Sequence, residues 1–113
     1  MTLPGEMAEQ VAAEFLAGRG LKLIERNYRC RFGEIDLIMR HGPTLVFIEV
    51  RYRRNDSFGG AAESITPAKR EKLLRTARHY MASRPEFPDC RFDAVLLGGD
   101  AKEPRWIENA FGE

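Results

Sequence analysis

The segment from Gly33 to Arg53, GEIDLIMRHGPTLVFIEVRYR, limits the fold more than any other part of the chain. Two runs rich in Ile, Leu, Val and Phe flank a Gly-Pro pair, and such punctuation between apolar runs is typical of a hairpin turn. We therefore predict antiparallel strands over residues 32–40 and 44–53. If the hairpin closes symmetrically about Gly42 and Pro43, the numbers of cross-strand partners sum to 85.

This register divides the hairpin into two faces. The first is apolar, as the buried side of an antiparallel pair should be, and it pairs Ile35 with Val50, Leu37 with Ile48 and Met39 with Val46. The second pairs Ile38 with Phe47, Asp36 with Glu49 and Glu34 with Arg51. Like charges directly opposite each other destabilise a sheet. A basic neighbour such as Arg51 could neutralise the two acids without any function, and a shift of one residue would separate them.

The remaining pattern predicts the order helix, three strands, helix, strand. The first helix covers residues 5–18, with Met7, Val11 and Phe15 beside Ala8, Ala12 and Leu16 on its apolar side. Glu9 borders this side and can reach across the surface on which the helix packs, although most helix glutamates are simply solvated. Residues 21–31 form the first strand. Residues 54–65 combine Gly, Ser and Asn with little periodicity, which indicates a loop.

The second helix begins with Thr66 as N-cap and Pro67 in its first turn, and it extends to about Ser83. Its inner side carries the apolar residues Leu73, Leu74, Ala77, Tyr80 and Met81. RFDAVLL, at 91–97, reads as a buried strand beside the hairpin. The tail with Trp106 and Phe111 shows no clear pattern.

Length and composition predict one compact α/β domain over residues 1–113. No apolar run approaches the roughly 20 residues of a membrane span, so we expect a cytoplasmic protein without membrane contact. Cys30 and Cys90 are isolated, which gives no support to zinc or thiol chemistry. His41 and His79 are interpreted as structural or solvated residues.

Charge is unevenly distributed along the chain. Residues 19–84 contain fifteen basic and seven acidic residues, a net charge of +8, although the whole chain carries +1. Such a segment is typical of a surface that binds a polyanion, most commonly nucleic acid. A solvated helix face explains the same charges equally well.

Asp36 and Glu49 have the chemistry of a Mg²⁺ or Mn²⁺ site. Mg²⁺ prefers oxygen ligands, takes one or two protein carboxylates and keeps water or phosphate in its other positions. The carbonyl of Val50 is a candidate third ligand, and Glu9 could reach the site through a water. Arg51, two residues after Glu49, points to the same face and could bind a scissile phosphate. Such ions assist phosphodiester hydrolysis.

Asp36 and the sequence Glu49-Val50-Arg51, after a helix with Glu9, resemble the PD-(D/E)xK core of restriction enzymes and archaeal Holliday-junction resolvases. The segments AEQVAAEFLAGRGLKLIERNYRCRFGEIDLI, VFIEVRYR, FGGAAESIT and CRFDAV are more closely similar to bacterial YraN-type proteins, an uncharacterised family of predicted endonucleases. The resemblance implies a restriction-endonuclease-like mixed sheet flanked by helices in αβββαβ order.

The resemblance also implies roles for individual residues. Asp36 and Glu49 would be the metal ligands and Glu9 the helix acid. Arg51 stands where the superfamily usually has lysine, which keeps the charge but removes the option of deprotonation. Glu34 faces Arg51 in the register given above and would hold the arginine in place. Ser64 and Lys69 stand where related nucleases have polar residues near the phosphate.

Our first hypothesis is therefore a metal-dependent endonuclease that hydrolyses DNA. Branched or repair-related DNA is the substrate considered. Phosphates would be held without base reading by Arg51, Arg53, Arg54, Lys69, Arg70 and Lys72. A second hypothesis is a non-catalytic nucleic-acid-binding module on the same fold. A third is an interaction protein whose acidic face binds a basic partner. Homodimerisation would suit a small one-strand site, but the sequence indicates no interface.

Overall fold

The computed structural model describes residues 5–53, 66–98 and 103–111. The elements are α1 (Gly5–Ala17), β1 (Lys22–Cys30), β2 (Gly33–His41), β3 (Thr44–Arg53), α2 (Pro67–Met81), β4 (Cys90–Gly98) and β5 (Arg105–Phe111). The predicted α/β class and the order αβββαβ are confirmed. The tail adds β5, a strand that its sequence pattern did not reveal.

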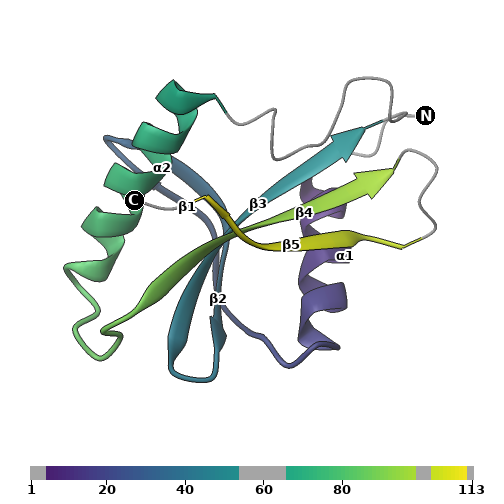
Figure 1. The fold of residues 1–113 in the computed structure, drawn as a ribbon, viewed down its shortest axis with the longest axis horizontal. Coiled ribbons are helices and arrows are strands. Elements are labelled where there is room, and N and C mark those ends of the chain that lie inside the picture. Colours follow the sequence, from purple (N-terminus) through teal and green to yellow (C-terminus); the bar gives the residue numbers. More distant parts are fainter. Residues whose placement is uncertain (1–4, 54–65, 99–102, 112–113) are drawn as a thin grey trace.

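The five strands form one sheet in the order β1-β2-β3-β4-β5. Neighbours are antiparallel except β3 and β4, which run parallel and are joined through α2. Figure 1 shows α1 and α2 at opposite ends of the twisted sheet. One core cluster packs under α1 around Leu37, Val46 and Ile48, and the other packs under α2 around Phe47 and Tyr80. The helices therefore cover opposite faces.

The β2–β3 hairpin has the predicted register, but its ladder is shorter than predicted. Paired positions from His41 with Thr44 to Leu37 with Ile48 all sum to 85. Beyond Ile48 the two strands are no longer paired, because β2 continues along β1 to Gly33 while β3 continues along β4. The sheet thus opens between its second and third strands at the level of Asp36 and Glu49.

The predicted face of Ile35 is wrong. Ile35 packs in the α2-side cluster together with Ile38, whereas Leu37 packs on the α1 side. Strict alternation would place Ile35 with Leu37. The interruption falls at Asp36, and on β1 the residue Asn27 has a φ of 50°, a left-handed conformation, between the paired positions Arg26 and Tyr28. The strands therefore bend where they leave the regular ladder.

The apolar side of α1 is rotated from the predicted one. Ala8, Ala12 and Leu16 are buried, but Met7 is 54% exposed and Val11 is 39% exposed. Small alanine side chains let the helix backbone approach the sheet closely, so the alanine side faces inward rather than the side with larger residues. Phe15 is partly buried at the border.

Helix α2 follows the prediction. The hydroxyl of Thr66 accepts a hydrogen bond from the backbone N–H of Lys69 at 3.2 Å, and Pro67 occupies the first turn. The predicted inner residues all pack in the α2-side cluster. Neither helix in the described part of the chain is long and apolar enough to cross a membrane.

Candidate functional site

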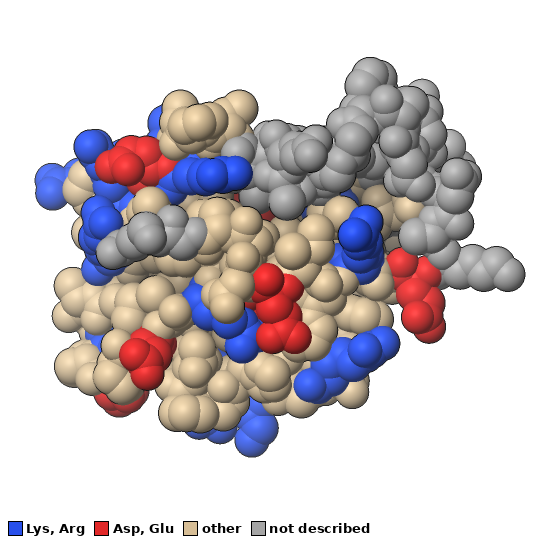
Figure 2. Space-filling model, in the orientation of Figure 1, with Lys and Arg blue, Asp and Glu red and all other residues tan. Residues whose placement is uncertain are grey.

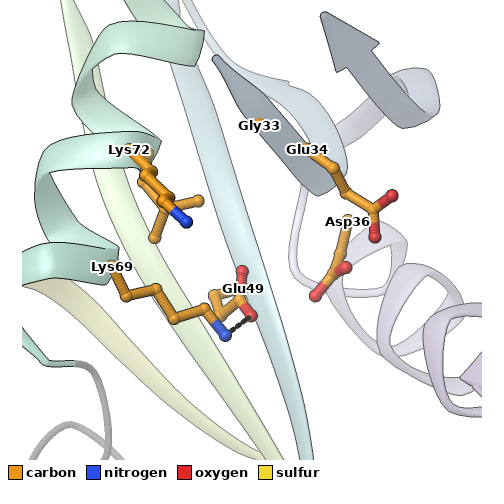
Figure 3. A pocket seen from close by; sticks show the side chains of 7 residues that line it. Gly33, Glu34, Asp36, Glu49, Lys69 and Lys72 are labelled. Carbon is orange, nitrogen blue, oxygen red and sulfur yellow. Dashed lines mark ion pairs between the residues drawn. The ribbon is translucent and has the colours of Figure 1, made fainter. Parts of the chain in front are cut away.

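Asp36 and Glu49 lie on either side of the opening between β2 and β3. Both line a cavity of about 190 Å³ that is closed on its other side by Lys69, Lys72 and Leu73 of α2. Figure 3 shows the two lysines reaching from α2 toward the carboxylates. The same two acids also line a second cavity of about 270 Å³, toward α1. The acid pair therefore lies between two cavities, one on the side of each helix.

The carboxylate of Asp36 occupies the place of a missing strand partner. Its Oδ2 accepts a hydrogen bond from the backbone N–H of Val50 at 2.8 Å, which satisfies a donor left free by the end of the ladder. Burial, followed by the nearby charge of Glu49, raises the pKa of Asp36 to about 7. The hydrogen bond from Val50 opposes this shift, while Glu9 and Glu34 add to it. Without a cation, Asp36 thus readily holds a proton.

Glu49 is buried, with 7% of its surface exposed, and two cations contact it. The Nζ atom of Lys69 lies 2.9 Å from Oε1 of Glu49, and Nη2 of Arg51 lies 3.5 Å from the same oxygen. Both contacts use Oε1. The geometry therefore brings Lys69, which the sequence placed only near the phosphate, into direct contact with the proposed metal ligand.

Arg51 has a buried donor that finds no partner in the part of the chain that the structure describes. Its Nε atom is inaccessible to solvent and forms no hydrogen bond to any of the described residues. A buried unpaired donor costs free energy, on the order of 1–3 kcal/mol. A ligand oxygen beside Glu49 would satisfy this atom only after the guanidinium rotates, because Nε is inaccessible in its present position.

The oxygen donors at the opening fit Mg²⁺ or Mn²⁺. Within one strand residue the N–H and C=O groups point to the same side, so the bond from the Val50 N–H to Asp36 also directs the Val50 carbonyl toward the opening. In the described residues no three His, Cys, Asp or Glu side chains converge as a closed metal cage. Two carboxylates and one carbonyl would hold an ion only in an open site, where the ion retains water or phosphate oxygens in its other positions.

Glu9 and Glu34 line different cavities of the candidate site. Glu9 of α1 is half-buried and lines the 270 Å³ cavity with Asp36 and Glu49, as a helix acid reaching the site should. Glu34 also lines the α2-side cavity, but its ion pair is with Arg29 of β1 at 2.6 Å. The predicted pairing of Glu34 with Arg51 is wrong, because the β2–β3 ladder has ended before these positions.

The remaining predicted phosphate-binding residues divide by position. Lys72 is exposed and lines the α2-side cavity, and Arg70 is exposed on α2. Figure 2 shows basic side chains gathered over α2, with acidic atoms among them. Arg54, Ser64 and the side chain of Arg53 lie outside the described residues.

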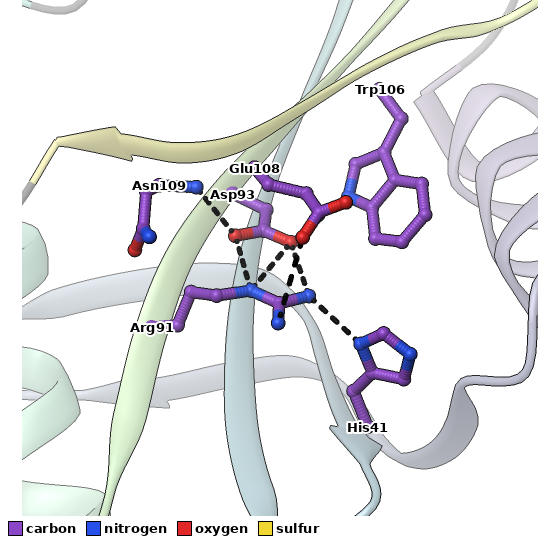
Figure 4. A network of polar contacts seen from close by, with 6 residues as sticks. All are labelled: His41, Arg91, Asp93, Trp106, Glu108 and Asn109. Atoms are coloured by element: carbon purple, nitrogen blue, oxygen red, sulfur yellow. Dashed lines mark hydrogen bonds and ion pairs between the residues drawn. The ribbon is translucent and has the colours of Figure 1, made fainter.

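A second buried carboxylate, Asp93 of β4, escaped the sequence analysis. It is fully buried and accepts hydrogen bonds from Arg91, from the indole N–H of Trp106 at 2.9 Å and from the backbone N–H of Asn109 at 3.1 Å. Nη2 of Arg91 also contacts His41 at 3.2 Å (Figure 4). Both carboxylate oxygens of Asp93 accept hydrogen bonds, including those from Trp106 and Asn109 of β5, so this network holds β5 on the sheet. An acid within the apolar run FDAVLL was the available signal.

Comparison with known proteins gives one consistent result. The model of the family described as "Uncharacterised protein family UPF0102" matches residues 8–97. A UPF0102 protein of Nitrosomonas europaea is 61% identical over 96% of this chain and 93% of its own length. UPF0102 proteins of Nitrosospira multiformis and Psychromonas ingrahamii are 58% and 51% identical, over 98% and 96% of this chain and 94% and 89% of their own lengths. The chain belongs to the UPF0102 family.

Proposed function

We propose that this protein is a metal-dependent endonuclease of the PD-(D/E)xK type that hydrolyses phosphodiester bonds of DNA. One observation carries the proposal. Asp36 and Glu49 lie together at the opening of the sheet, beside a carbonyl that points the same way and a buried arginine donor that has no partner among the described residues. Oxygen ligands on one side and a phosphate-binding cation on the other are what such hydrolysis requires.

Asp36, Glu49 and the Val50 carbonyl would hold Mg²⁺ or Mn²⁺, and the ion would supply an activated water and neutralise charge on the phosphate. Arg51 would donate its Nε–H and Nη2–H groups to a phosphate oxygen. The Nζ atom of Lys69 now lies 2.9 Å from Oε1 of Glu49. When the ion binds Glu49, Lys69 would loosen this ion pair and shift toward the same phosphate. Asp36 would release its proton when the cation binds.

The polar surroundings favour a polyanionic ligand over a basic protein partner. Arg51 and Lys69 lie within the acid site itself, and Lys72 lies at its border. A basic partner would meet these cations before it reached the carboxylates. Arg70 and Lys72 on α2, together with the predicted Arg53 and Arg54, would hold the backbone of the nucleic acid.

The test is cleavage of labelled single-stranded, duplex and four-way-junction DNA, with matching RNA, in Mg²⁺, Mn²⁺ or EDTA. We expect cleavage that requires the metal and disappears in both Asp36→Asn and Glu49→Gln. Glu86→Gln is the matched control, since Glu86 is an exposed acid paired with Arg84. The proposal would be contradicted if wild type cleaved DNA in EDTA or if both site variants kept their activity.

A second candidate is a nucleic-acid-binding module without catalysis. The ion pair between Lys69 and Glu49 favours it, because a lysine at 2.9 Å already neutralises the carboxylate. In that case wild-type protein would bind DNA in a salt-dependent manner, and neither metal would produce cleavage. Lys69→Ala separates the two candidates, since freeing Glu49 should strengthen Mn²⁺ binding measured by calorimetry only if the site is a metal site.

A further inference from the structure

The turn between β1 and β2 carries an aromatic residue where turns usually have small or polar ones. Cys30 pairs with Gly33 in the ladder, so Arg31 and Phe32 are the two turn residues. Gly, Asn, Asp, Pro and Ser dominate such positions for conformational reasons. Phe32 is half-buried, and neither cluster of the described core includes it. The fold therefore does not use this ring to fill its interior.

The turn is fixed beside the candidate site. Gly33, directly after Phe32, lines the α2-side cavity together with Asp36 and Glu49. A Cβ atom at Gly33 would lie 3.0 Å from Oγ1 of Thr76 on α2, which shows how closely the turn approaches the helix. Phe32 therefore directly precedes a residue that lines the cavity of the acid pair, while its own ring lies against His79 of α2.

A series of aromatic contacts supports the ring from the core outward. Tyr80 contacts Tyr28 edge to face, with ring centroids 5.0 Å apart. The hydroxyl of Tyr28 lies 2.7 Å from Nδ1 of His79, and the His79 ring contacts Phe32 edge to face at 5.8 Å. His79 itself is exposed on α2. These contacts orient Phe32 before any ligand arrives, which lowers the entropy cost of binding.

A cation lies against the ring. The guanidinium of Arg31 lies 4.8 Å from the centroid of Phe32. Arg31 and Lys72 form no ion pair with any carboxylate of the described residues, and Lys72 lines the adjacent cavity. Aromatic rings beside unpaired cations are the usual means by which proteins bind single-stranded nucleic acid, through base stacking and phosphate contacts.

We propose that Phe32, held by His79 and accompanied by Arg31 and Lys72, is a stacking platform for an unpaired base next to the phosphate in the Asp36–Glu49 cavity. This inference rests on the proposed function and specifies its substrate, namely a nucleic acid with at least one unpaired nucleotide at the site. A base pair within a duplex presents its face to its neighbours and leaves none for Phe32.

The experiment measures binding in EDTA, so that no cleavage occurs. The ligands are a single strand, a duplex with an overhang and a blunt duplex, the first two carrying 2-aminopurine at an unpaired position. We expect Phe32→Leu to weaken binding to the first two ligands by about tenfold, the lower range for one stacked base, and to change blunt-duplex binding less than twofold. Stacking should also quench the 2-aminopurine fluorescence of wild type, and Phe32→Leu should abolish this quenching.

Phe15→Leu is the matched control. Phe15 is also partly buried and also lies under an arginine, with the Arg19 guanidinium 4.6 Å from its ring centroid, but it is on α1. Its substitution should leave quenching and overhang preference unchanged. Phe32→Trp keeps an aromatic face and should restore both. If Phe32→Leu unfolds, quenching of the added tryptophan emission in Phe32→Trp by single-stranded but not blunt DNA decides the question.

The outcomes separate this inference from the proposed function. Equal binding of all ligands by wild type and Phe32→Leu, or a parallel loss on all of them, would overturn the platform even if metal-dependent cleavage were found. Phe32-dependent quenching without any cleavage by wild type would support the platform and contradict the endonuclease. An apolar protein partner at Phe32 is the remaining alternative, and absence of quenching with every nucleic acid would point to it.

Discussion

The carboxyl group of Asp36 is largely buried and lies near Glu49, and both effects favour its protonated form. Two carboxylates that bind a cation must both be ionised when the cation is present. Without the cation, the two negative charges repel each other unless one carboxylate is protonated. A proton on Asp36 removes this repulsion. Metal binding and stability should therefore respond to pH in opposite ways through this one residue.

The first prediction concerns the stability of the protein in EDTA. Because the pKa of Asp36 is about 7 in the folded protein against 3.8 for an ordinary aspartate, the folded state holds more protons than the unfolded state between these values. The free energy of unfolding should then fall as pH rises from about 4 to about 7, by about 1.4 kcal/mol for each unit of pKa difference at most. Asp36→Asn should remove this dependence, so that its advantage over wild type in urea unfolding grows from pH 4 to pH 8.

Glu25→Gln serves as the control for this measurement, because Glu25 is an exposed acid on β1. An advantage of Asp36→Asn that is the same at both pH values would contradict the assigned cause. Metal affinity of wild type should rise over the same pH interval, since the cation competes with the proton.

The second prediction concerns Arg51. Removal of one preorganised donor to a transition state typically lowers the rate by 10²- to 10³-fold, and we expect about this loss for Arg51→Gln in single-turnover cleavage. Arg51→Lys keeps a cation beside Glu49 and should remain within about tenfold of wild type. Arg40→Gln, an exposed arginine of β2, is the control. If Arg51→Gln cleaves as wild type does, the buried Nε of Arg51 has no part in catalysis.

At the scale of the elements, β5 depends on a single buried acid. Asp93 joins Arg91 of its own strand to Trp106 and Asn109 of β5, where the register between β4 and β5 shifts. Loss of one partner from a buried ion pair leaves an uncompensated charge. We expect Asp93→Asn to lower the free energy of unfolding by about 3 kcal/mol, measured in urea, and to shift the emission of Trp106.

Glu108→Gln is the matched comparison. Glu108 contacts the same arginine at 3.8 Å, but its side chain is 53% exposed. Exposed pairs contribute 0–1 kcal/mol, so this change should cost less than about 1 kcal/mol. Equal losses for the two variants would mean that burial does not decide the strength of this network.

The same elements indicate what the sequence could predict. Local signals sufficed for the turn at Gly42, the cap at Thr66 and the buried side of α2. They failed where distant strands decide the outcome. Ile35 changes face because β2 follows β1 rather than β3, and the orientation of α1 depends on how closely its alanines approach the sheet.

The candidate site divides in the same way. The turn alone sets the register of β2 and β3, and this register places Asp36 and Glu49 at the same level of the two strands. Lys69 reaches Glu49 across the parallel crossover, which no local pattern reveals. Asp93 was missed although it has the same sequence signal as Asp36, an acid within an apolar strand.

At the scale of the whole molecule, the net charge of +1 conceals a separation of charge. The basic excess of residues 19–84 lies partly on α2 (Figure 2), and Lys69 and Lys72 of this helix line the candidate site. DNA binding in EDTA should weaken with salt, with a logarithmic slope of about −0.9 for each phosphate neutralised on duplex DNA. Lys72→Ala should reduce this slope by about one unit, whereas Lys22→Ala on β1 should not. Unchanged slopes in both variants would place the contact surface elsewhere.

The hairpin geometry also has a consequence for the order in which the molecule assembles. Asp36 and Glu49 are thirteen residues apart, so closing their loop costs little chain entropy, whereas Lys69 must be brought back over a longer loop. We expect β2 and β3 to pair first and to carry two adjacent acids until α2 arrives. The cation on α2 then makes docking of that helix electrostatically favourable. Pulse-labelled hydrogen exchange during refolding should accordingly protect the amides of Leu37–Ile48 before those of Leu73–Tyr80, and the reverse order would contradict this sequence of events.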